Sequence, residues 1–207
     1  MTTQDRPRMV VGISGASGVI YGKRMLESLG ALGIETHLVM SAAARVTMAH
    51  ETDFTPRDLE RIADVTYSNK DIGAACSSGS FRTLGMVVAP CSVKSMAEIA
   101  CGTTTTLLSR AADVVLKERR KLVLMLRETP LHLGHLRNMT AVTEMGAIIY
   151  PPVPAFYARP ASLDEMVDHT VGRVLDLFGL DTGAVRRWTG QRPAGAGSTV
   201  RSLHPGE

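Results

Sequence analysis

The sequence predicts an α/β fold in which a doubly wound parallel sheet lies between two layers of helices. Short apolar runs rich in valine, isoleucine and leucine alternate with amphipathic helical segments along the chain. Polar residues gather directly after these runs, at the carboxyl ends of the strands, where such sheets bind ligands. A chain of 207 residues with 44% hydrophobic residues can also bury one sizeable core.

The first third of the chain begins with two strand–helix units. Residues 9–14 form an apolar run that predicts a buried strand, and residues 19–32 follow with helical spacing. Residues 34–40 predict the second strand, and Ser41 is expected to cap the next helix. A short polar helix is expected over residues 56–63.

The middle of the chain adds two more strands. Residues 66–80 are rich in Ser, Gly, Asn and Asp and predict a loop. Residues 84–90 predict a third strand, followed by a helix in which Ser95 and Glu98 have capping-box spacing. Residues 103–120 place an apolar stripe on a helix, and residues 121–127 predict the fourth strand.

The last third contains the fifth strand and the final helix. Thr129 is expected to cap a helix that has Pro130 at its first position and ends near Met145. The remaining elements are a strand over 146–151, a rigid proline-rich loop over 151–160 and an amphipathic helix over 163–179. One domain is therefore expected over residues 1–189, followed by a flexible polar tail over 190–207.

Composition excludes several classes of protein. The net charge of +3 is spread without a run of like charges, which argues against a nucleic-acid partner. Cys76, Cys91 and Cys101 lack paired spacing, so neither a disulfide framework nor a zinc site is expected. The first apolar run is too short for a signal peptide or a membrane span. A cytoplasmic protein is the resulting expectation.

Histidines do not point to a metal site either. His132 and His135 have a spacing that two metal ligands could use, but no third ligand is evident. They are expected to lie at the surface or to cap helices, as are His37, His50 and His169.

The loop after the first strand predicts an anion site. Gly12, Gly15 and Gly18 are spaced G-x-x-G-x-x-G, with Ser14 and Ser17 between them. Backbone amides of such a turn, entering a helix, bind phosphate; the alternative is a tight turn with serine caps. No carboxylate follows the second strand to hold a ribose, so FMN fits better than a dinucleotide.

Two other strand ends carry candidate chemistry. Ser92 and Lys94 could contact a ring edge or a phosphate; the alternative for Ser92 is a helix cap. Cys91 has no neighbouring base and is expected to be a small buried residue. Arg127 and Glu128 suit phosphate recognition and proton transfer, or else form a pair that caps the next helix. These two interpretations stay open.

Two further places offer cations. Arg110 and Lys117 are seven residues apart and share one helix face, which usually means solvent but also suits a second phosphate. Arg173 lies among apolar residues of the last helix, where a surface arginine is the default.

Taken together and in order, these segments resemble the UbiX-type flavin prenyltransferases and the related phenolic-acid decarboxylase partner proteins. The resemblance covers about residues 9–188. The stretches that carry it are GISGASG, ETHLVMS, ETDF, SSGSFRTLGM, APCSVK, RAADVVLKERRKLVL, RETPLHLGHLRNM and PPVPAFY.

The resemblance implies a flavodoxin-like or Rossmann-like α/β domain that assembles into dodecamers, with FMN bound where subunits meet. It implies transfer of a dimethylallyl group from dimethylallyl monophosphate to N5 and C6 of reduced FMN. The product, prenylated FMN, would pass to a UbiD-type decarboxylase. No metal ion is implied.

The resemblance also assigns residues to roles. The implied FMN-binding residues are Gly15, Ala16, Ser17, Ser41, Cys91, Ser92, Val93, Lys94 and Arg127. Those implied for the prenyl phosphate and its surroundings are Ser78, Arg110, Lys117, Tyr157, Arg173 and Trp188. The implied catalytic residues are Ser17, Glu51, Glu128 and Tyr157.

Three alternative functions rank below prenyl transfer: oxidative decarboxylation of a cysteine, direct decarboxylation of a hydroxyarylic acid, and non-catalytic flavin carriage. The cysteine-type enzymes use an Asn-containing segment where this chain has PCSVKS with Lys94. Direct decarboxylation needs no prenyl phosphate, and a carrier would bind FMN without consuming a prenyl donor.

Overall fold

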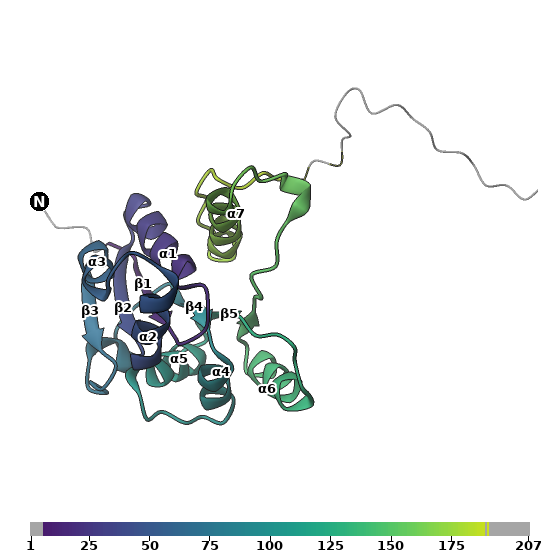
Figure 1. Ribbon diagram of the computed structural model, residues 1–207. Coiled ribbons are helices and arrows are strands. Elements are labelled where there is room, and N and C mark those ends of the chain that lie inside the picture. The colour runs from purple at the N-terminus through teal and green to yellow at the C-terminus, as the bar shows by residue number, and fades with distance from the viewer. Residues whose placement is uncertain (1–5, 189, 191–207) are drawn as a thin grey trace, which may run out of the picture.

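A computed structural model describes residues 6–188 and residue 190, and it forms three layers (Figure 1). The central sheet is parallel throughout, with strand order β3-β2-β1-β4-β5-β6. The predicted doubly wound α/β fold is confirmed. The strands are β1 (Arg8–Ile13), β2 (Glu35–Met40), β3 (Val65–Ser68), β4 (Gly85–Cys91), β5 (Lys121–Leu126) and β6 (Ile148–Ile149).

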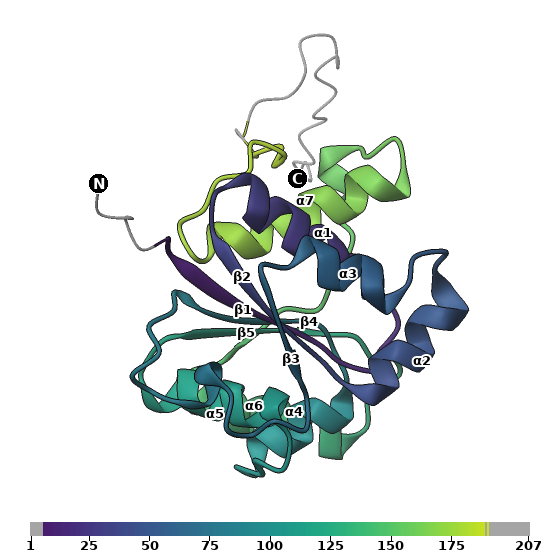
Figure 2. The same cartoon turned by 90° about the vertical axis from the view of Figure 1, so that its left-hand side faces the viewer.

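Helices cover both faces of the sheet. Figure 2 shows α1, α3 and α7 on one side, here called the α1 face, and α4, α5 and α6 on the other, the α5 face. The helices are α1 (Val19–Ala31), α2 (Ala42–Glu51), α3 (Pro56–Ile62), α4 (Val93–Ala100), α5 (Leu107–Lys117), α6 (Leu133–Glu144) and α7 (Leu163–Asp176). Two short 3-10 helices are η1 (Ala75–Ser77) and η2 (Phe156–Ala158).

The core lies on both faces of the sheet. Every residue of β4 is buried, as expected for a strand covered on both sides. Met25 and Leu26 of α1 pack on one face, and Leu107 and Leu108 of α5 pack on the other. Because all strands are parallel, their carboxyl ends share one edge, here called the carboxyl edge, and their first residues share the opposite amino edge.

The prediction of a loop over residues 66–80 was wrong, because this stretch contains most of β3, a strand that was not predicted, and η1. β3 pairs only with β2 and lies at the edge of the sheet. Its residues alternate between half-buried and exposed, so they form no apolar run. An edge strand therefore carries a weaker sequence signal than the buried strands.

One predicted capping box and one predicted helix start were also wrong. α4 is capped by Ser92, whose Oγ accepts a hydrogen bond from Ser95 N at 3.2 Å, and Ser95 and Glu98 do not form its capping box. α6 begins after His132, whose Nδ1 accepts from Gly134 N at 3.0 Å, rather than at Thr129 and Pro130. In both cases a nearby polar side chain satisfies a free helix amide at a different position from the one predicted.

His37 was predicted at the surface or as a cap, and it is buried, with 2% of its surface exposed. Its Nδ1 lies 3.0 Å from Tyr67 Oη, and its Nε2 lies 2.8 Å from Glu35 Oε1. His169 is also buried, at 6% exposure. The two polar partners of His37 explain how β2 tolerates an imidazole in its interior.

Acid is expected to destabilise the protein through His37. Burial lowers the pKa of His37, as does the charge of Arg8, while Glu35 and Asp64 act in the opposite direction. The unfolded chain therefore binds a proton at higher pH than the folded chain, so stability falls as pH drops below about 6.5. Urea unfolding of the wild type and of His37→Gln between pH 5 and 8 measures how the free energy of unfolding depends on pH. The same pH dependence in the two proteins would contradict the prediction.

Glycine in place of Arg119 is expected to stabilise the protein by about 1 kcal/mol. Arg119 follows α5 in the left-handed conformation, with φ of 57°. Its amide donates to Leu116 O at 3.0 Å, and the amide of Arg120 donates to Val115 O at 2.9 Å, which forms a Schellman motif. Arg119→Ala removes the same charge without relieving the backbone. Equal unfolding midpoints for the two variants would refute the explanation.

Within the described residues, no helix combines the length and the apolarity that crossing a membrane requires. Apart from Gly190, the tail predicted over 190–207 lies outside the described residues.

Candidate functional site

A cavity of about 320 Å³ opens at the carboxyl edge of the sheet. It lies beside the loop after β1 and the starts of α2, α4 and α5. Four predicted FMN-binding residues line it together: Gly15, Ser41, Ser92 and Lys94. The other lining residues are Ala42, Ala43, Asn69, Ser95, Glu98, Thr106 and Leu108.

Three helices present their N-termini to this cavity. Ser41 Oγ accepts a hydrogen bond from Ala44 N at 3.1 Å, which confirms the predicted cap of α2. Ser92 caps α4, and Thr106 caps α5. Each N-terminus carries partial positive charge, so the converging helices make the cavity attractive to an anion.

α5 differs from the other two helices in its first turn. Leu107 N donates to Asn69 O, and Leu108 N donates to Asn69 Oδ1, both at 2.9 Å. Among the described residues, the first amides of α2 and α4 have no such partner. These amides therefore remain as donors for a bound anion.

The glycine loop is pressed against the start of α2. A Cβ atom at Gly15 would lie 2.4 Å from Ala43 Cβ, so only glycine fits there without a shift. Ser14 is fully buried, and its Oγ donates to Pro90 O at 3.0 Å and accepts from Ser92 N at 2.7 Å. Ser14 thus joins β1 to the end of β4, and Ser17 is the partly exposed serine of this loop.

Glu51 lies next to the loop although it is distant in sequence. Its Oε2 accepts hydrogen bonds from Gly18 N at 2.8 Å and from Val19 N at 3.4 Å. The last residue of α2 therefore caps α1 and places a carboxylate beside Ser17. Spacing along the chain offered no sign of this contact.

The thiol of Cys91 is not available as a nucleophile. It is fully buried, and burial raises its pKa to about 12. The preferred interpretation of Cys91 as a small buried residue is confirmed. Its carbonyl oxygen accepts from Arg127 N at 3.0 Å, which ties β4 to the end of β5.

Arg127 and Glu128 follow β5 at the same edge. Arg127 is exposed, and Glu128 is half-buried. Glu128 Oε1 accepts a hydrogen bond from Thr129 N at 3.0 Å, so it stabilises the turn that follows β5.

Lys117 and Ser78 lie far from this cavity within one chain. Lys117 ends α5, four residues before β5 begins at Lys121, so it lies near the amino edge. Ser78 precedes β4 and lies near the same edge. A helix of this length spans about 15 Å, which separates Lys117 from the cavity at the start of α5.

Tyr157, Arg173 and Trp188 lie near α7, on the α1 face of the sheet. The ring of Tyr157 lies 5.7 Å from that of His169 and 6.0 Å from that of Trp188, centroid to centroid. Arg173 Nη1 pairs with Asp176 at 2.6 Å. Because Arg110 and Lys117 are on α5, a single chain splits the predicted phosphate ligands between opposite faces of the sheet.

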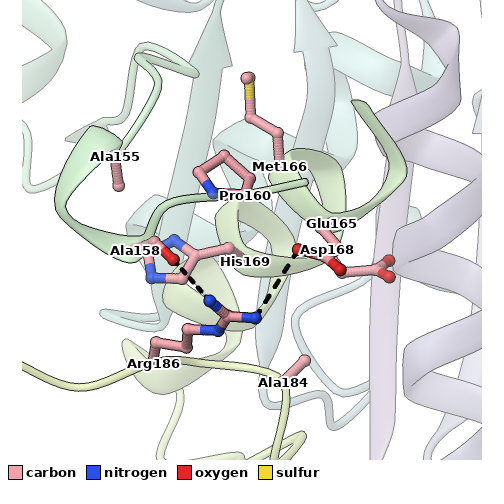
Figure 3. A pocket seen from close by; sticks show the side chains of 9 residues that line it. All are labelled: Ala155, Ala158, Pro160, Glu165, Met166, Asp168, His169, Ala184 and Arg186. Carbon is pink, nitrogen blue, oxygen red and sulfur yellow. Dashed lines mark hydrogen bonds and ion pairs between the residues drawn. The ribbon is translucent and has the colours of Figure 1, made fainter. Parts of the chain in front are cut away.

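A second cavity, of about 240 Å³, lies between η2, α7 and the segment after it (Figure 3). Arg186 closes one side, because Nη1 donates to Ala158 O at 2.9 Å and Nη2 lies 3.8 Å from Glu165 Oε2. His169 also lines it. None of the predicted site residues lines this cavity.

The sequence analysis missed Asn69 and Thr106. Asn69 directly follows β3, the strand that was also missed. The available signal was the stretch VTYSN, in which residues of alternating character are followed by an asparagine. Thr106 stands in a run of four threonines, where spacing does not show which one caps the helix. Within residues 6–188, no three His, Cys, Asp or Glu side chains are grouped to hold a metal ion.

The chain is similar to known proteins over most of its length. Residues 1–175 match the Flavoprotein family. The flavin prenyltransferase UbiX of Escherichia coli K12 is 60% identical over 186 residues, which cover 88% of this chain and 98% of that protein.

Two solved structures are similar over most of the chain. AnUbiX (PadA1), in complex with FMN and dimethylallyl pyrophosphate, has a TM-score of 0.89 and 51% identity and covers 90% of this chain and 100% of its own. A dodecameric FMN-dependent UbiX-like decarboxylase from Escherichia coli O157:H7 has a TM-score of 0.85 and 49% identity, covering 87% and 98%.

Proposed function

The chain belongs to the UbiX-type flavin prenyltransferases of the Flavoprotein family, and from this premise we propose how its residues serve the reaction. The enzyme joins a dimethylallyl group to FMN and produces prenylated FMN. We propose N5 and C6 of the flavin as the positions of the two new bonds. We place the flavin in the cavity at the carboxyl edge of the sheet. The observation that supports this placement is that three helix N-termini converge on that cavity.

The FMN phosphate binds among the starts of α2 and α4. The free amides there, the Ser41 hydroxyl and the ammonium of Lys94 supply donors and positive charge. Ser92 lines the same cavity, and Ala16 and Val93 are its neighbours in the loop after β1 and at the start of α4. Arg127 stands exposed at the neighbouring strand end. Cys91 contributes through its backbone, because its side chain is buried.

Ser17 and Glu51 serve the reacting end of the flavin. Reduced FMN, when bound, supplies nucleophilic positions at N5 and C6. The Ser17 hydroxyl lies in the loop that Glu51 holds in place through Gly18 N. Ser17 orients the ring by hydrogen bonding, and Glu51 keeps that loop fixed against the cavity.

The prenyl phosphate is held by groups from more than one chain. Arg110 and Lys117 on one face, and Tyr157 and Arg173 on the other, cannot close around one ligand within a single chain. The related Escherichia coli O157:H7 protein is dodecameric. We propose the same assembly here, in which a neighbouring copy completes the clamp and the cations stabilise the departing phosphate.

The remaining assignments concern the donor, the last proton and the recipient of the product. We propose dimethylallyl monophosphate as the donor. Glu128 or the released phosphate takes the proton lost when the second bond forms. Prenylated FMN passes to a UbiD-type decarboxylase in the cytoplasm. A single flavin-binding domain spans 1–189, and Trp188, which lies against Tyr157, helps to close the site.

The experiment that tests this function is anaerobic. The purified protein is mixed with reduced FMN and dimethylallyl monophosphate, and the mass of the extracted flavin is recorded. A gain of one dimethylallyl unit is expected. Unmodified flavin with both the monophosphate and the diphosphate would instead support a decarboxylase or a flavin carrier.

A further inference from the structure

The turn that carries Ser78 is fastened to the end of α5. Residues 77–82, here called the serine turn, reverse the chain through a hydrogen bond from Phe81 N to Ser78 O at 3.2 Å. Ser78 is exposed, and its Oγ lies 2.9 Å from Ser80 Oγ. The turn thus presents two hydroxyl groups outward.

Arg120 holds the serine turn by its backbone. Nη1 donates to Phe81 O and Nη2 donates to Gly79 O, both at 2.7 Å. These two carbonyl groups flank Ser80, so the planar guanidinium spans the turn with both arms. A lysine ammonium is a point charge and could not reproduce this fork.

Gly79 brings the serine turn against Lys117. A Cβ atom at Gly79 would lie 2.1 Å from Glu118 Oε1 and 2.8 Å from Lys117 Nζ. Lys117 also pairs with Glu118, and this hydrogen bond holds the pKa of Glu118 below its usual range. The ammonium and the turn therefore form one surface at the amino edge of the sheet.

The end of α5 aims Arg120 at the turn. The Schellman motif at Arg119 ends the helix and reverses the chain, so Arg120 follows directly and its guanidinium reaches the serine turn. On the other side, the Phe81 ring lies 4.9 Å from that of His37 and 5.2 Å from the guanidinium of Arg8. The serine turn is held from both sides.

We propose that Arg120 is a positioning residue for prenyl-donor binding. Its guanidinium fixes the serine turn so that Ser78 and Lys117 present a single phosphate-binding surface to the flavin site of a neighbouring copy. This inference rests on the proposed function, because that function assigns Lys117 and Ser78 to the donor. Arg120 itself does not touch the donor and acts through the turn.

Steady-state kinetics of the full-length enzyme with reduced FMN and dimethylallyl monophosphate test the proposal. Arg120→Ala is expected to raise the donor KM by about tenfold, because two charge-assisted hydrogen bonds are lost. The Kd for FMN and the size of the assembly are expected to stay at wild-type values. Added guanidinium ion is expected to restore part of the donor affinity.

Arg119→Gly is the matched control, since it removes the neighbouring guanidinium and leaves the carbonyl bonds of Arg120 in place. Its donor KM is expected to equal that of the wild type. If Arg120→Ala does not fold, Arg120→Lys decides, because it keeps the charge and loses the fork; a raised donor KM is expected.

A wild-type donor KM in the folded Arg120 variants would overturn the proposal. Equal loss of FMN and donor affinity, or a changed assembly, would also overturn it, because Arg120 would then serve the fold. Failure of the proposed function is a separate result: the wild type itself would leave the flavin unmodified.

Discussion

Alanine at position 117 is expected to lower kcat/KM for the prenyl donor by about 100- to 1,000-fold. The Lys117 ammonium stabilises the phosphate as it leaves, and this charge is worth most in the transition state. FMN binding is expected to stay intact, because Lys117 lies at the amino edge, away from the cavity of its own chain. Kinetics with the monophosphate donor and titration with FMN measure the two effects.

Mixed assemblies reveal whether Lys117 acts on a neighbouring chain. Coexpression of Lys117→Ala with the flavin-binding variant Gly15→Ala, assayed at an FMN concentration too low to load Gly15→Ala, creates active sites that combine the intact loop of one chain with the intact lysine of another. Random mixing of equal amounts is expected to restore about one site in four. Lys117→Ala mixed with Lys117→Gln is the control and is expected to stay inactive. Failure of the first mixture to recover would place Lys117 in the site of its own chain.

A single methyl group at Gly15 is expected to weaken FMN binding by about tenfold to 100-fold. The new Cβ atom would lie 2.4 Å from Ala43 Cβ, so the loop and the start of α2 must separate. Overpacking of this kind costs about 1–3 kcal/mol, and every 1.4 kcal/mol is tenfold in affinity. Fluorescence titration of the flavin measures the change.

Ala43→Gly supplies the compensating change. The double variant, Gly15→Ala with Ala43→Gly, removes the closest contact and is expected to recover most of the FMN affinity. Ala43→Gly alone is expected to bind FMN normally and to lose about 1 kcal/mol of stability from lower helix propensity. Wild-type affinity in Gly15→Ala would show that the loop does not hold the flavin tightly.

Elements with strong periodicity were predicted well, and elements without it were not. The buried strands and the helices α1, α5 and α7 each occur where an apolar run or stripe indicated them. β3 was not predicted, because half of its residues face solvent at the edge of the sheet. α6 began later than predicted, because the side chain of His132 caps it.

Some residues of the candidate site could also be predicted from the sequence, and others could not. Ser41 and Ser92 could be placed at strand ends from the sequence, because parallel strands bring their carboxyl ends to one edge. Asn69 could not, since it follows the missed strand. The contact of Glu51 with Gly18 also could not be read from the sequence, because it joins residues 33 positions apart.

The sequence by itself determined the α/β architecture and the family, because these depend on local patterns and on motifs in order. Only the tertiary structure showed that Arg110 and Lys117 lie on one face of the sheet and Tyr157 and Arg173 on the other. Which groups share a site depends on chain crossovers and helix lengths, which motifs do not record. A functional set gathered from motifs along one chain can therefore be distributed over several copies in space.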